Sequence, residues 1–164
     1  MLTEKEFIKA IEENQQIIFK VSNMYMDTKA DREDLFQEIM LNAWKGIKNF
    51  KGESKFSTWL YRVALNTSIS FFKKDKKEQK VLAWEKTKLS VPEAPSIETE
   101  QLAAMNKAIS ELSGIDKALV MLYLEDYSYQ QIAEVIGITA NHVGVKMNRI
   151  RVLLKENSKK HLSQ

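Results

Sequence analysis

The sequence predicts an all-α protein made of two small helical domains joined by a flexible linker. Its 164 residues include five Gly and two Pro, which are too few turn-forming residues for an all-β fold. Apolar residues recur at the three- and four-residue spacing of helices. Both prolines lie within residues 91–96, close to Glu98 and Glu100, and this stretch is the candidate linker.

Residues 1–50 predict two helices. Thr3 and Glu6 fit a capping box, in which each side chain accepts a hydrogen bond from a free amide at the helix start. Apolar residues continue this first helix to Val21, with Ile8 on its inner face. Residues 24–30 are expected to form a turn, after which Asp31 is expected to cap the second helix. The apolar face of that helix comprises Leu35, Phe36, Ile39, Ala43, Ile47 and Phe50.

A third helix is expected from about Phe56 to Lys74, after a break at residues 51–54. Aromatic rings and cations are interleaved here, a pattern that can stack single-stranded bases while contacting phosphates. Trp59 shares a face with Leu60 and Val63, which favours a place in the core over a contact with bases. The polar face offers better candidates for nucleic-acid contacts: Arg62, Asn66 and Lys73.

The C-terminal part predicts helices over about 102–112, 116–124 and 129–136, and another after Gly137. Ser128 and Gln131 fit a second capping box. Gly137 allows a tight turn, and Thr139 can cap the helix that follows. Two short helices joined in this way form a helix-turn-helix, whose second helix enters the major groove of DNA.

The last helix has two distinct faces at about 100° per residue. Val143, Met147, Ile150 and Leu154 cluster on the side that must face the core. The opposite side presents groups that can contact base edges: Asn141, His142, Val145, Lys146, Asn148 and Arg149. Arg151 and the lysines beyond it are expected to meet phosphates. The alternative is an ordinary pair of helices with a basic surface.

Composition excludes several classes of protein. The absence of Cys excludes a disulfide scaffold, thiol catalysis and a Cys-based zinc site. Two His, at positions 142 and 161, offer little for a metal site or a general base, so no metal and no cofactor are expected. No apolar run is long enough to cross a bilayer, and the polar start does not suit a signal peptide. We therefore expect a cytoplasmic protein with no membrane insertion.

The net charge of +3 conceals an uneven distribution. Counted along the chain, residues 1–50 carry −2, 51–90 carry +6, 91–134 carry −6 and 135–164 carry +5. Two separate basic segments indicate two contacts with a polyanion. The alternative is two solvated helix faces that bind nothing.

Three blocks of the sequence resemble bacterial RNA polymerase sigma factors of the extracytoplasmic-function (ECF) class, in the sigma-70 family. They are DREDLFQEIMLNAWKGIKNFKG, SKFSTWLYRVALNTSISFFKK and ISELSGIDKALVMLYLEDYSYQQIAEVIGITANHVGVKMNRIRVLLKE. The blocks follow the order of the family's regions 2 and 4. The resemblance implies region 2 over residues 1–78, a linker over 79–100, region 4 over 101–158 and a basic tail over 159–164.

The resemblance also implies a function without chemistry of its own. Region 2 would help melt the promoter and capture −10 bases, through Lys55, Phe56, Trp59, Arg62, Asn66 and Lys73. Region 4 would read the −35 element, through the exposed face of the last helix together with Arg151. Core RNA polymerase, promoter DNA and an anti-sigma factor are the implied partners. Polymerase would contact the second helix, at Asp34, Gln37, Glu38, Leu41, Asn42 and Trp44.

Three alternatives remain open at this point. Leu41 and Trp44 project away from the core stripe of their helix, which suits either a protein partner or a second intramolecular contact. A stand-alone helix-turn-helix regulator would share the C-terminal pattern but would not need the pattern of residues 56–74. An enzyme acting on nucleic acid is disfavoured, because the carboxylates of Asp31, Glu33 and Asp34 already suit the positive end of a helix.

Overall fold

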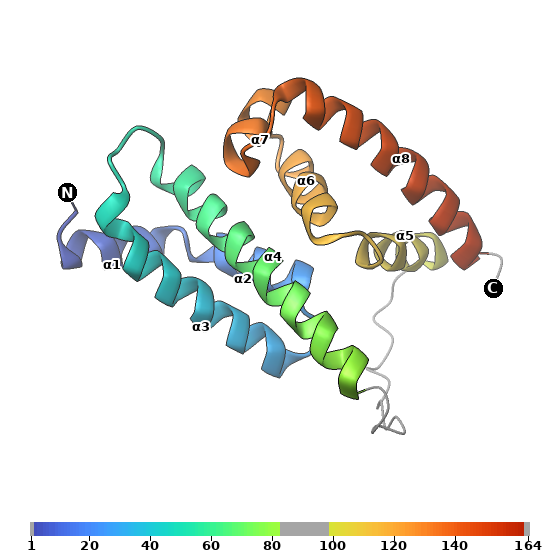
Figure 1. Cartoon of the computed structure of the whole chain (residues 1–164), viewed down its shortest axis with the longest axis horizontal. Coiled ribbons are helices and arrows are strands. Elements are labelled where there is room, and N and C mark those ends of the chain that lie inside the picture. The colour runs from blue at the N-terminus through green and yellow to red at the C-terminus, as the bar shows by residue number, and fades with distance from the viewer. Residues whose placement is uncertain (1, 83–98, 163–164) are drawn as a thin grey trace.

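The computed structural model describes the backbone of residues 2–82 and 99–162, and the side chains of 2–74 and 99–162. Within those ranges the chain is helical and contains no strand, which confirms the all-α prediction. We call α1–α4 the N-terminal lobe and α5–α8 the C-terminal lobe (Figure 1). The proline-containing stretch 91–96 lies outside the described residues.

The N-terminal lobe begins with a broken helix rather than a continuous one. α1 spans Glu4–Glu13 and α2 spans Gln15–Tyr25. The capping box of Thr3 and Glu6 forms as predicted. The break falls at Asn14, whose side-chain amide donates to the carbonyl of Ala10 at 2.8 Å. The buried face of α1 consists of Phe7 and Ile11, and Ile8 is 49% exposed and does not belong to the core.

The second predicted helix starts earlier than expected. α3 spans Lys29–Gly46 and is followed by the short 3-10 helix η1, Ile47–Asn49. Thr28 is the cap, and its hydroxyl accepts a hydrogen bond from the amide of Asp31 at 3.1 Å. The prediction that Asp31 is the cap was therefore wrong, because a hydroxyl three residues upstream reaches the free amide first.

α4 is a helix that packs on helices of both lobes. It spans Phe56–Leu82, eight residues beyond the predicted end at Lys74. It packs on α2 and α3 within its own lobe and on α6 and α7 of the other. Leu60 and Ala64 are completely buried, whereas Phe56, Trp59 and Val63 are half-buried. Gly52, in the loop before α4, has a φ of +74°, which glycine adopts readily.

The C-terminal lobe consists of α5 (Glu100–Ser110), α6 (Gly114–Leu124), α7 (Tyr129–Ile136) and α8 (Ala140–Leu162). α5 and α7 both pack on α8, and Figure 1 shows α8 on the far side of this lobe from α3. α8 also includes residues 159–162, the beginning of the expected basic tail. Buried residues of the two lobes form one continuous hydrophobic cluster.

Candidate nucleic-acid interface

The turn between α7 and α8 has the geometry of a helix-turn-helix. Ser128 and Gln131 form the predicted capping box at the start of α7, with hydrogen bonds of 2.9 and 3.1 Å. Gly137 ends α7 in the left-handed conformation at φ 86°, and Ile138 packs against the core. The hydroxyl of Thr139 then accepts a bond from the amide of His142 at 3.1 Å. Local sequence signals therefore fix the direction of α8.

The core face of α8 is the one predicted. Val143, Met147 and Ile150 are at most 3% exposed, and Leu154 is half-buried. On the opposite side, Val145 is 52% exposed and Lys146 is half-buried. The other candidate base-reading residues are exposed: Asn141, His142, Asn148 and Arg149.

Arg151 differs from its neighbours because it already has partners within the lobe. Its guanidinium donates to the hydroxyl of Tyr129 at 3.2 Å and to the side-chain oxygen of Asn148 at 3.4 Å. It also lies 5.4 Å from the ring centre of Tyr123. Bonding to the Tyr123 side chain raises the pKa of Arg151 above its usual value. Arg151 thus links α8 to α6 and α7. Its predicted contact with a phosphate would have to be made while these contacts within the lobe are kept.

The candidate −10 residues of the N-terminal lobe fall into two groups. The aromatic rings pack on one another, and the polar side chains are exposed. Trp59 lies 5.4 Å from both Phe50 and Phe56, and Phe56 lies 6.4 Å from Phe7. This ring cluster gives Trp59 the packing role that its helix face predicted. The polar candidates are exposed on or beside α4: Lys55, Arg62, Asn66 and Lys73.

Arg62 points toward the other lobe. Its guanidinium donates to the backbone carbonyls of Glu134 and Val135, which lie in the last turn of α7. The carbonyl end of a helix carries partial negative charge, so a cation is favoured there. In this arrangement the predicted DNA contact of Arg62 is replaced by an intramolecular one.

The predicted polymerase-binding surface lies along α3. Asp34, Gln37 and Glu38 are exposed, and Leu41 is 45% exposed. Asn42 is half-buried, and its amide donates to the hydroxyl of Thr67 at 3.0 Å, so this residue also ties α3 to α4.

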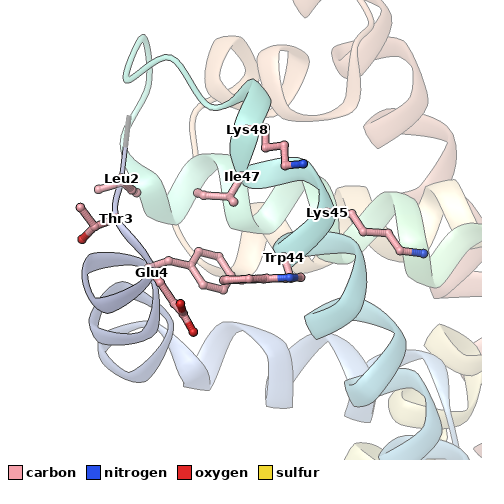
Figure 2. Close-up of a pocket in the computed structure, with 8 residues that line it drawn as sticks. Leu2, Thr3, Glu4, Trp44, Lys45, Ile47 and Lys48 are labelled. Atoms are coloured by element: carbon pink, nitrogen blue, oxygen red, sulfur yellow. The ribbon is translucent and has the colours of Figure 1, made fainter.

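Trp44 makes an intramolecular contact and is nevertheless partly exposed. Its ring is 5.3 Å from that of Phe7, yet the residue is 47% exposed. Figure 2 shows Trp44 beside Lys45, Ile47 and Lys48, facing the N-terminal residues across a hollow in the surface.

Sequence reasoning missed the residues at the contact between the lobes. Lys117 is 3% exposed, and its ammonium lies 4.3 Å from the ring centre of Phe72. The hydroxyl of Tyr25 donates to the carbonyl of Gly114 at 2.5 Å. The only signal for Lys117 was a charge within an apolar stretch, which does not identify its partner.

Neither a metal centre nor a membrane span is found in the described part of the chain. Within residues 2–82 and 99–162 there is no group of three or more His, Cys, Asp or Glu placed to hold a metal ion. In the same ranges no helix has both the length and the apolar character needed to cross a bilayer.

The fold and these faces define a two-lobed helical protein with a helix-turn-helix in its second lobe. The family model for sigma-70 region 2 matches residues 10–78, and that for sigma-70 region 4 matches residues 102–154. Together the two models span most of the chain. The chain belongs to the sigma-70 family of RNA polymerase sigma factors.

Individual relatives agree with this assignment. RNA polymerase sigma factor YlaC of Bacillus subtilis is 28% identical over 134 residues, covering 78% of each chain. The ECF sigma-E factor of Haemophilus influenzae is 27% identical, covering 78% of this chain and 75% of its own. Among solved structures, the sigma factor RpoE of Bartonella quintana, in complex with the anti-sigma factor NepR, matches with a TM-score of 0.70. It is 21% identical and covers 94% of this chain and 98% of its own, so it supports the fold.

Proposed function

We propose that this protein binds core RNA polymerase and directs it to promoters, acting as an ECF sigma factor without enzymatic activity of its own. The observation that carries the proposal is the ordered pair of family matches over 10–78 and 102–154. A stand-alone helix-turn-helix regulator would account for the second match but not for the first. The proposal places the protein in the cytoplasm, with its polymerase.

The C-terminal lobe supplies the −35 contacts in this proposal. Asn148 and Arg149 are exposed on α8 and can make bidentate bonds to base edges, each worth about 1–3 kcal/mol of discrimination. Val145 can touch a thymine methyl. Lys146 flanks these base-reading residues, while Lys155, Lys159 and Lys160, further along α8, bind phosphates and set the register without specifying sequence.

The N-terminal lobe supplies the −10 contacts. Lys55 and Asn66 are exposed, and Phe56 is half-buried within the ring cluster. A base pulled from the stack costs a few kcal/mol, which contacts to Phe56, Asn66 and the preceding loop would offset. Lys73 and Arg62 would contact the backbone of the separated strand.

Core polymerase would bind the exposed side of α3. Leu41 and Trp44 form an apolar strip beside Asp34, Gln37 and Glu38, and such a strip fits a protein partner. Asn42 would contribute from its place beside Thr67. The division into region 2 (1–78), linker (79–100), region 4 (101–158) and tail (159–164) belongs to this proposal. So does an anti-sigma factor, the kind of partner that the Bartonella quintana sigma factor has in its complex.

The test is transcription in vitro with purified core polymerase on a library of promoter sequences. The proposal predicts that adding the protein enriches transcripts from templates that share one −35 and one −10 motif. Core polymerase alone is the control. Enrichment of a −35-like motif in DNA binding without any transcription would favour the stand-alone regulator instead.

A further inference from the structure

Arg151 lies one helical turn after Asn148, a residue to which the proposed function assigns base contacts. The guanidinium of Arg151 donates to the side-chain oxygen of Asn148 at 3.4 Å. A guanidinium carries only donors, so the group that it binds must be the Oδ1 of the asparagine and not its NH2. The chemistry of the pair therefore fixes which way round the amide of Asn148 lies on the exposed face of α8.

Arg151 is itself restrained by the two preceding helices. Its guanidinium donates to the hydroxyl of Tyr129, on α7, at 3.2 Å, and lies 5.4 Å from the ring centre of Tyr123, on α6. The Tyr129 ring also lies against α8 at Gly144, where an added Cβ would meet it at 3.7 Å. Because residues 144, 148 and 151 share one face of a helix, Tyr129 contacts α8 on both sides of Asn148. Arg151 therefore has partners besides Asn148 that hold it in place.

The orientation of the Asn148 amide decides which base it can read. A free asparagine reads adenine, because its oxygen accepts a hydrogen bond from the N6 amino group while its NH2 donates to N7. Asn148 has its oxygen turned toward Arg151, which leaves the NH2 for a base edge. Guanine presents two neighbouring acceptors, N7 and O6, to such a donor. Adenine is a poorer match, because its N6 amino group would place a second donor against the NH2.

We propose that Arg151 is a positioning residue for promoter specificity, which orients Asn148 so that it reads guanine instead of adenine. The proposal rests on the proposed function, because it takes the exposed face of α8 to lie in the major groove. It gives Arg151 a role that differs from a phosphate contact in its effect. A phosphate contact strengthens binding to every sequence alike, whereas the orientation of Asn148 changes the preference at one base pair.

The test is selection of bound DNA from a duplex library randomised over the −35 element, using holoenzyme formed from core polymerase and the full chain. Asn148→Ala identifies the base pair that Asn148 reads, because the preference there is lost. We expect a G·C pair at that position with the wild-type protein. We expect Arg151→Ala to raise the share of A·T at the same position several-fold, since the released amide can then bind adenine through both of its groups.

Two further variants separate orientation from charge and from stability. Lys155→Ala is the matched control, because it removes the next cation along α8, which is also exposed. It should weaken binding to all sequences without changing any preference. Tyr129→Phe keeps the ring but removes the hydroxyl that binds Arg151, and should shift the preference in the same direction as Arg151→Ala, to a smaller extent.

A second measurement needs no DNA. In the free protein, the NMR shift of the side-chain carbonyl carbon of Asn148 should change in Arg151→Ala and stay constant in Lys155→Ala. Unchanged base preferences in Arg151→Ala, or a pair other than G·C at the Asn148 position of the wild type, would overturn the proposal. So would an Asn148→Ala variant that keeps every preference. If the wild-type holoenzyme enriches no sequence at all, the proposed function is wrong and this inference falls with it.

Discussion

Tyr61 on α4 packs edge-on against Tyr127, in the turn between α6 and α7, with their ring centres 5.6 Å apart. The contact joins residues far apart in sequence and lies where the two lobes meet. Tyr61 is 4% exposed and Tyr127 is half-buried, and this burial raises the pKa of both phenols. The conformation of the free chain is therefore set by interactions between the lobes as well as within each of them.

Replacement of Arg149 tests the −35 reading. Arg149→Ala should cost about 1–3 kcal/mol in binding to the cognate −35 element and should relax specificity there. Binding of duplex promoters by the holoenzyme, with and without −35 substitutions, measures both effects. Lys155→Ala is the control, because loss of a phosphate contact weakens all sequences alike. Unchanged discrimination in Arg149→Ala would show that another residue reads the element.

Phe56 tests the role of α4 in promoter melting. Phe56→Ala should impair opening more than closed binding, so that a template with a pre-melted bubble restores transcription. Because Phe56 also packs on Phe50 and Trp59, Phe56→Leu is a useful companion that keeps apolar bulk without a ring to stack. Equal losses on duplex and pre-melted templates would contradict this role.

Replacement of Gly144 by alanine should affect the stability of the protein and its binding to DNA in opposite directions. Alanine at this position is favoured in a helix by up to about 1 kcal/mol, and its added carbon would meet the Tyr129 ring at 3.7 Å, an ordinary contact. Gly144→Ala should therefore raise the melting temperature while weakening −35 binding, if the backbone of α8 lies close to DNA. Gly46→Ala, on α3, is the control that should leave −35 binding intact. Tighter −35 binding by Gly144→Ala would refute the close approach.

Because the phenol of Tyr25 is buried, we expect the stability of the folded protein to fall at alkaline pH. Burial raises the pKa of its phenol above the unfolded value of about 10. The folded protein therefore keeps a proton that the unfolded chain releases, and stability present below pH 10 is lost as the pH rises above it. Urea unfolding between pH 9 and 11 measures the slope.

Tyr25→Phe provides the control for that measurement. The variant removes the hydrogen bond from the Tyr25 hydroxyl to the Gly114 carbonyl, which should cost about 1 kcal/mol at neutral pH. The difference between wild type and variant should shrink above pH 10. A difference that stays constant across the range would mean that the Tyr25 phenol does not titrate with unfolding.

The helix-turn-helix could be predicted because its determinants are local. The capping box at Ser128, the left-handed Gly137 and the apolar face of α8 act within a few residues of one another. Errors arose where two local signals competed. Thr28 and Asp31 are both good caps, and the apolar spacing that predicted one helix to Val21 continues past the break at Asn14.

The contact between the lobes could not be predicted, because its partners are distant in sequence. Arg62 and the carbonyl of Glu134 are 72 residues apart, and no periodicity relates them. The sequence identified Arg62 as an exposed cation on α4. A guanidinium can bind either a phosphate or the carbonyl end of a helix, and the sequence does not distinguish between them. The contact of Arg62 with the end of α7 follows from the way the two lobes pack, which no local pattern encodes.

Association with core RNA polymerase tests the central claim most directly. The purified protein, mixed with core polymerase lacking any sigma factor, should elute with it as a one-to-one complex in gel filtration. Arg149→Ala should co-elute equally well, because its defect lies in DNA reading. Leu41→Ala/Trp44→Ala should weaken the complex through the exposed side of α3. If the wild-type protein elutes apart from core polymerase, the proposed function as a polymerase-binding specificity factor is wrong.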